Sequence, residues 1–87
     1  MVLIKEVTKK DLQAAFADAL HSYRKTHRLS QSKMAKLLDI HERCYVDLEH
    51  GRFCPSAITL VTFMGVLPVE ARLSFIEKII SPRQQGM

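Results

Sequence analysis

The sequence of 87 residues contains little glycine, proline or cysteine (three, three and two residues) and no tryptophan. So few glycines leave no material for a glycine-rich phosphate-binding loop, a collagen-like repeat or a low-complexity linker. Two cysteines are too few for a disulfide scaffold and are typical of a reducing compartment. The protein is therefore expected in the cytoplasm.

Long apolar runs are also missing. The apolar start, Met1 to Ile4, is too short for a signal peptide. The longest stretch without a full charge, residues 53–69, contains two prolines and is shorter than the roughly 20 residues that a membrane-spanning helix needs. We therefore predict no membrane-spanning segment and interpret this stretch as containing a buried core helix.

What the sequence does contain is typical of one small soluble domain covering residues 1–87. Hydrophobic residues make up 47% and charged residues 25% of the chain, which excludes an intrinsically disordered protein. Thirteen lysines and arginines against nine acidic residues give a formal charge of +4. This balance favours an anionic partner but says nothing about the fold.

The spacing of the apolar residues is helical almost throughout and predicts an all-α domain of five helices. The core of the domain is expected within residues 9–67, with 82–87 as a tail, and only Val2 to Val7 alternates as a short extended segment would. The five predicted helices cover about Lys9–His27, Ser30–Leu38, His41–His50, the stretch from Pro55-Ser56 to Leu67, and residues 68–81.

Polar residues mark the ends of these helices. Thr8, with Asp11 three residues later, and Ser30 are expected to cap helix N-termini. Asp39 stands where a turn is needed and tolerates a left-handed backbone, and Gly51 is expected to end the third helix.

Apolar stripes indicate which faces are buried. In the first three helices the inward residues include Phe16, Leu20, Met34, Ala35, Leu38, Tyr45 and Leu48. The fourth helix, with Ile58, Leu60, Val61, Phe63, Met64 and Leu67, is too apolar for a surface element. In the fifth, Val69, Leu73, Ile76 and Ile80 form a stripe that is expected to close the core, and Phe75 and Ile79 form a second apolar edge. Either all six pack inward, or the second edge is buried against another molecule.

Charges are segregated along the chain. Between Ala19 and Leu38 every full charge is positive, and between Asp39 and Glu49 only Arg43 is. The positive residues of the first segment are Arg24, Lys25, Arg28, Lys33 and Lys36. They predict an anion-binding rim rather than an ordinary solvated face, and an acidic short helix follows them.

The residues Leu29-Ser30-Gln31-Ser32-Lys33-Met34-Ala35-Lys36-Leu37-Leu38-Asp39-Ile40, followed by Leu48-Glu49-His50-Gly51-Arg52 and Pro55-Ser56, match a known pattern. The string resembles the Cro and phage-repressor (xenobiotic-response-element) family of helix-turn-helix proteins, without a gap from Leu29 to Val66. The resemblance implies a repressor-like fold and a sequence-specific DNA-binding transcriptional regulator. It departs from the pattern at Asp39, where the family has glycine, and at His41, where the family has serine or threonine.

The resemblance also implies where double-stranded DNA would lie. The third helix would enter the major groove with Glu42, Arg43, Val46 and Asp47 facing the bases. Gln31, Lys33, His50 and Arg52 would contact phosphates. Arg24 would form an ion pair with Glu49, as the family's Arg–Glu pair does. Two carboxylates facing DNA either select a sequence by rejecting others or indicate another use for this helix.

Family members commonly dimerise through helices that follow the motif, so Phe75 and Ile79 are candidate residues of a homodimer interface. An alternative function is a protein-interaction module, such as the antitoxin of a toxin–antitoxin pair with a toxin-like protein partner. The acidic third helix and the apolar fifth helix favour it, and the sequence does not separate the two hypotheses.

Metal binding and catalysis have little support. His41, Cys44, His50 and Cys54 lie close in sequence, but their spacing matches no usual structural zinc site. No histidine has an evident nucleophile or orienting partner, and Ser30 and Ser56 are explained by capping. We predict a protein without catalytic residues, cofactor, metal or small-molecule substrate.

Overall fold

The computed structural model describes residues 8–80 of the chain, which form five helices and contain no strand. The helices are α1 (Lys9–Thr26), α2 (Gln31–Leu38), α3 (Glu42–Glu49), α4 (Ala57–Val66) and α5 (Val69–Ile80). The all-α fold predicted from the sequence is confirmed, and the predicted boundaries differ from these by one or two residues. The expected extended segment Val2 to Val7 and the tail 82–87 lie outside the described residues.

Local chemistry explains where the helices begin. The Thr8 hydroxyl accepts a hydrogen bond from the Asp11 amide, and the Asp11 carboxylate accepts one from the Thr8 amide, which makes a capping box for α1. Ser30 and Ser56 accept hydrogen bonds from Lys33 and Thr59 in the same way. His41 occupies the capping position of α3 but makes no side-chain capping bond.

Left-handed residues end two of the helices. Asp39 closes α2 in the left-handed conformation, with φ 60°, as expected from the sequence. Gly51 follows α3 with φ 70°, and a Cβ there would lie 3.7 Å from that of Ala17 on α1. Arg28 also has a positive φ, 54°, in the connection between α1 and α2, which the sequence analysis did not foresee.

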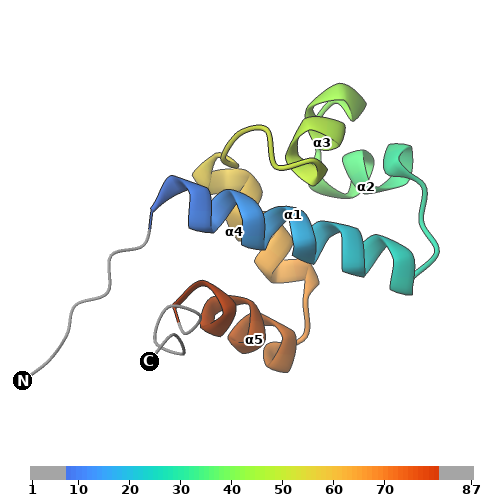
Figure 1. The fold of residues 1–87 in the computed structure, drawn as a ribbon. Coiled ribbons are helices and arrows are strands. Elements are labelled where there is room, and N and C mark those ends of the chain that lie inside the picture. Colours follow the sequence, from blue (N-terminus) through green and yellow to red (C-terminus); the bar gives the residue numbers. More distant parts are fainter. Residues whose placement is uncertain (1–7, 81–87) are drawn as a thin grey trace, which may run out of the picture.

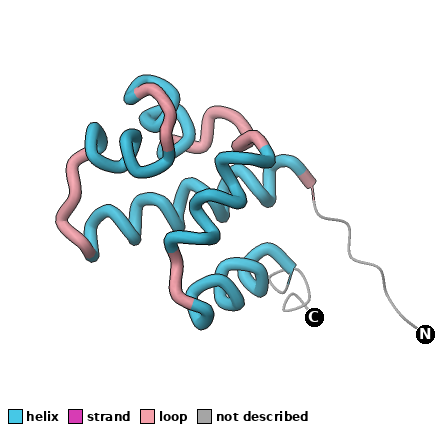
Figure 2. Tube along the Cα trace, turned by 180° about the vertical axis from the view of Figure 1, so that it is seen from behind, coloured by secondary structure: helices cyan, strands magenta, loops and turns pink. Residues whose placement is uncertain are grey.

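The helices are arranged around α1. In Figure 1, α2 and α3 lie on one side of α1, and α5 lies on the other. Seen from behind in Figure 2, α4 crosses α1. The first helix therefore separates the α2–α3 pair from α5.

Aromatic side chains connect these elements in the core. The ring of Phe16 on α1 packs edge-to-face against Phe63 on α4, with centroids 5.4 Å apart, and against Phe75 on α5 at 6.2 Å. Leu20, Tyr45 and other residues complete the buried set: Met34, Ala35, Leu38, Leu48 and Leu67.

The prediction that α4 is buried all round is wrong. Ile58 is 76% exposed and Val61 is 67% exposed. Within residues 8–80, one face of α4 is buried, at Thr59 and Phe63. Leu60 and Met64 pack partly against the core, and Leu67 is buried just beyond the helix. Overall hydrophobicity does not tell which face of a helix has neighbours to cover it, and here it led to an overestimate of burial.

The two apolar edges of α5 are reversed relative to the sequence interpretation. Phe75 is only 5% exposed and belongs to the core, and Ile79 packs against that core. The four residues of the predicted core stripe are exposed instead: Val69 at 61%, Leu73 at 59%, Ile76 at 44% and Ile80 at 41%. Assigning Phe75 to a dimer interface is therefore incorrect, because this fold leaves it no free surface.

Arg72 fixes the junction between α4 and α5. Its Nε donates hydrogen bonds to the carbonyl oxygens of Met64, at 2.7 Å, and Leu67, at 3.0 Å. These carbonyls lie at the end of α4, where intrahelical partners run out. The hydropathy pattern pointed to no such role. Within residues 8–80, each helix is too short or too polar to cross a lipid bilayer.

Candidate nucleic-acid interface

Helices α2 and α3 form a closely packed pair joined by residues 39–41. Met34, Ala35 and Leu38 of α2 are buried against Tyr45 and Leu48 of α3. Ala35 is 3% exposed, and a small side chain at this position lets the two short helices approach closely. The inner side of α3 is therefore closely packed against α2, and its opposite side faces outward.

Glu49, at the end of α3, is the buried centre of a polar cluster that is partly exposed. Its side chain is 4% exposed. Its Oε2 accepts hydrogen bonds from Arg24 Nε at 3.0 Å and His21 Nδ1 at 2.8 Å, and its Oε1 accepts one from Gln31 Nε2 at 2.9 Å. The predicted ion pair between Arg24 and Glu49 is thus present. We call these four residues the Glu49 cluster.

The Glu49 cluster joins three helices. His21 and Arg24 come from α1, Gln31 from α2 and Glu49 from α3. The Arg24 guanidinium also reaches the carbonyl oxygen of Leu29, at 3.4 Å, in the connection before α2. Because hydrogen bonds are directional, this cluster fixes the orientation of α3 more tightly than apolar contacts alone would.

Two pKa values reflect this environment. Burial acts to raise the pKa of Glu49, but hydrogen bonds from Gln31, His21 and Arg24 outweigh it, so its pKa is lowered. The pKa of the Tyr45 hydroxyl is raised, first by burial and then by the negative charge of Glu49. The carboxylate of Glu49 therefore stays ionised in a site that favours its charged form.

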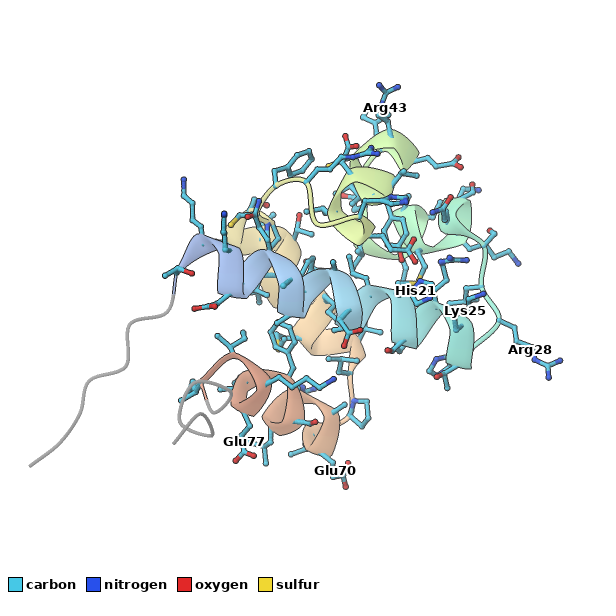
Figure 3. All side chains as sticks on the ribbon, in the orientation of Figure 1. His21, Lys25, Arg28, Arg43, Glu70 and Glu77 are labelled. Atoms are coloured by element: carbon cyan, nitrogen blue, oxygen red, sulfur yellow. The ribbon has the colours of Figure 1, made fainter. Side chains whose placement is uncertain are left out.

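The four residues of α3 that were predicted to contact bases differ in their exposure to solvent. Glu42 and Arg43 are exposed, whereas Val46 and Asp47 are half-buried. Arg43 projects into solvent at the end of the molecule opposite Glu70 and Glu77, as Figure 3 shows. Of the four, Arg43 supplies the one positive group that could reach a base edge.

Asp47 is paired with a residue predicted to contact phosphate. Its Oδ1 accepts a hydrogen bond from Arg52 Nη1 at 2.8 Å. The Arg52 side chain is 60% exposed, so the pair lies at the surface. This contact offsets one of the two carboxylates that made the acidic helix an obstacle to DNA.

The other three predicted phosphate contacts differ in availability. Lys33 is exposed in the first turn of α2. His50 is exposed, and its Nδ1 lies 2.8 Å from the carbonyl oxygen of Val46. Gln31 donates one N–H to Glu49, so only the second N–H of its amide remains for a phosphate.

The basic rim predicted on α1 and α2 is also divided. Arg24 turns inward to the Glu49 cluster, whereas Lys25, Arg28, Lys33 and Lys36 are exposed. Figure 3 marks Lys25 and Arg28 at the end of α1 that leads to α2. The exposed positive charge available to an anion is therefore smaller than the sequence count suggested.

His21 is the member of the cluster that sequence analysis missed. A signal was present, because His21 and Arg24 are three residues apart and so share one face of α1. Nothing in the sequence, however, distinguished this histidine from the other three.

The cysteines and histidines do not assemble into a metal site. Within residues 8–80, no three His, Cys, Asp or Glu side chains are grouped so that they could hold a metal ion. Cys44 and Cys54 are both free and half-buried, and the Cys54 thiol lies 3.6 Å from the carbonyl oxygen of Lys9.

The chain was compared with models of protein families, with curated proteins and with solved structures. None of the three comparisons gave a match.

Proposed function

We propose that this protein is a sequence-specific DNA-binding transcriptional regulator that places α3 in the major groove. The observation that carries the proposal is the Glu49 cluster, which holds α3 on α1 and α2 while Arg43 projects outward. A helix that reads bases must be held rigidly, because a contact to a base edge depends on position to within a few tenths of an ångström. In this proposal the protein acts in the cytoplasm without cofactor or catalytic step.

Direct recognition rests on Arg43 and Glu42. The Arg43 guanidinium can donate two hydrogen bonds to O6 and N7 of a guanine, and the Glu42 carboxylate can accept one from N4 of a cytosine. Asp47, already paired with Arg52 at 2.8 Å, supports the helix rather than opposing phosphate. Glu42 then remains as the acidic group that rejects most sequences.

Docking on the phosphate backbone rests on α2 and the residues after α3. Lys33 lies in the first turn of α2, whose free amide groups favour an anion. His50, the second N–H of Gln31 and the remaining N–H groups of Arg52 are the other donors. These contacts set register and affinity but carry no sequence information.

The decisive experiment is selection of genomic DNA fragments on the purified full chain at a stated salt concentration. An enriched site, bound with an affinity that falls as salt rises, supports the proposal. Binding that is absent, or that is equal for every duplex, contradicts it.

Two variants then separate the roles of α3 and α2. Arg43→Ala should relax the preference at one base position, at a cost of about 1–3 kcal/mol. Lys33→Ala should weaken binding to all sequences alike and reduce the salt slope by about one. Lys78→Ala is the matched control, because it removes a lysine from α5, across α1 from the proposed interface.

The proposal includes two copies of the chain on one DNA site. Two half-sites read by such motifs lie about 34 Å apart along the duplex. Phe75 is not part of any contact between the copies, because it is buried in the core. Sedimentation of the complex with the selected fragment measures how many chains are bound. Two chains are expected, and this measurement makes no assumption about α5.

A second candidate function is a protein-interaction module, such as the antitoxin of a toxin–antitoxin pair. The exposed apolar stripe of α5 favours it, because such a face on a small domain marks an interaction site. A protein partner that copurifies at fixed stoichiometry with the wild-type chain, but not with Leu73→Glu, would support this function. Copurification of the same partner with Leu73→Glu would contradict it.

A further inference from the structure

The outward surface of α5 combines an apolar stripe with acidic residues on one flank. The stripe is formed by Val69, Leu73, Ile76 and Ile80, all exposed. Their spacings of four, three and four residues keep them on one face of the helix. Glu70 and Glu77 each follow a stripe residue directly, so both lie on the same flank of the stripe.

The opposite flank is different. Arg72 and Ile79 each precede a stripe residue and therefore lie on the side away from Glu70 and Glu77. The Arg72 guanidinium is held by the carbonyl oxygens of Met64 and Leu67, and Ile79 packs against the core. This flank is thus used within the molecule, and the acidic flank is the one that faces solvent.

A second copy of the chain does not match this surface in an antiparallel arrangement. When two identical helices pair antiparallel about a two-fold axis, equivalent flanks face each other. Glu70 of one copy would then lie beside Glu77 of the other, so that carboxylate would oppose carboxylate.

A parallel pair is also poorly supported. It would place the acidic flank of one copy beside Arg72 of the other, but Arg72 is already bound to the end of α4. A standard interface uses about 20–30 residues on each side, so four stripe residues form only its central part. In such a small contact, the flanking charges decide which partner fits.

We propose that the outward face of α5 binds an amphipathic segment of a different protein, one whose apolar residues are flanked by lysine or arginine. The apolar stripe supplies the contact surface, and Glu70 and Glu77 select the positive partner. Neither carboxylate makes an ion pair with any of the residues 8–80. The inference rests on the second candidate function, for which it names the chemistry of the partner, and it does not depend on DNA binding.

The test uses two synthetic helical peptides as long as α5, which has 12 residues. Both carry leucine along one face; one has lysine at the flanking positions and the other has glutamate. Binding to the full chain, labelled for NMR, is measured without DNA. The lysine peptide should bind roughly tenfold more tightly, because two attractive pairs replace two repulsive ones, and should shift the resonances of the stripe residues.

Variants of the two glutamates sharpen the test. Glu70→Lys combined with Glu77→Lys should reverse the preference, so that the glutamate peptide binds more tightly. Glu42→Lys, which makes half of this charge change on α3, should leave the preference for the lysine peptide as in the wild type. Leu73→Glu should abolish binding of both peptides, and circular dichroism checks that its helix content is unchanged.

Two results would overturn the inference. One is equal binding of the lysine and glutamate peptides to the wild-type chain. The other is a wild-type chain that sediments as a dimer and becomes monomeric in Leu73→Glu, because a second copy would then occupy this face. Both results are independent of whether the protein binds DNA.

Discussion

Helices α3 and α5 lie on opposite sides of α1, and different kinds of contact hold them in the fold. α3 contributes the buried side chains of Tyr45 and Leu48 and, in addition, a buried carboxylate that accepts hydrogen bonds from α1 and α2. α5 contributes one buried residue, Phe75, with Ile79 packed beside it against the core, and an arginine that binds the end of α4. The first attachment fixes an orientation, and the second mainly covers apolar surface.

The outward faces of α3 and α5 also differ in polarity. α3 turns charged residues to solvent, with Arg43 prominent in Figure 3, whereas α5 exposes an apolar stripe beside two glutamates. The attachment that includes a buried carboxylate thus accompanies a charged outer face, and the attachment without one accompanies an apolar outer face. In the proposals above, α3 meets DNA and α5 meets a protein segment. Four predictions test how firmly each helix is held.

The largest effect is expected from the one deeply buried side chain of α5. Phe75→Ala should lower the free energy of unfolding by about 3–5 kcal/mol, because it opens a cavity against Phe16. Leu73→Ala, on the exposed side of the same helix, should change it by less than about 0.5 kcal/mol. Urea denaturation of both variants measures the difference. Similar losses would mean that α5 packs through the stripe after all.

The second prediction concerns the buried carboxylate of α3. Glu49→Gln should lower the free energy of unfolding by about 2–3 kcal/mol, because Arg24 loses its counter-charge in a mostly buried site. Gln31→Ala is the comparison, since it removes one neutral donor and should cost about 1 kcal/mol. A cost below that of Gln31→Ala, by thermal or urea denaturation, would show that the cluster adds little to stability.

The third prediction is a pH dependence that only α3 carries. The pKa of Glu49 is lowered in the folded chain from its ordinary value of 4.5. Its stabilising contribution should therefore be complete above that value and decline as the pH falls through the lowered folded pKa. Urea midpoints between about pH 6 and pH 3 should fall more steeply for the wild type than for Glu49→Gln. Parallel curves would contradict this assignment.

Much of the fold could be predicted because it depends on local chemistry. Thr8, Ser30 and Ser56 cap helices through their own hydroxyls, and Asp39 adopts the left-handed turn that follows α2. The Arg24–Glu49 pair, across 25 positions in sequence, came only from a resemblance. Spacing alone contains no signal for a contact between residues so far apart.

The errors all concern which face of a helix is covered. In α5, the edge that contains Val69 and Leu73 is as regularly spaced as the edge that contains Phe75. Which of the two edges is buried depends on where α1 lies. The prediction that Ile58 on α4 is buried was wrong for the same reason. Likewise, the pairing of Arg52 with Asp47 depends on the path of the chain after Gly51.

The smallest effect is expected where α5 meets α1 through an ion pair. Lys78 Nζ lies 3.2 Å from Asp18 Oδ2, but the two side chains are 58% and 61% exposed, so water and salt screen their attraction. A double-mutant cycle with Lys78→Ala and Asp18→Ala should give a coupling of less than about 0.5 kcal/mol. The same cycle for Arg24 and Glu49 should give about 2 kcal/mol or more, because their carboxylate is buried and bound on both oxygens. Each pair joins a residue of α1 to another helix. Unequal couplings would therefore show that burial, rather than the presence of an ion pair, makes α3 the firmly oriented helix. Equal couplings would remove that distinction between α3 and α5.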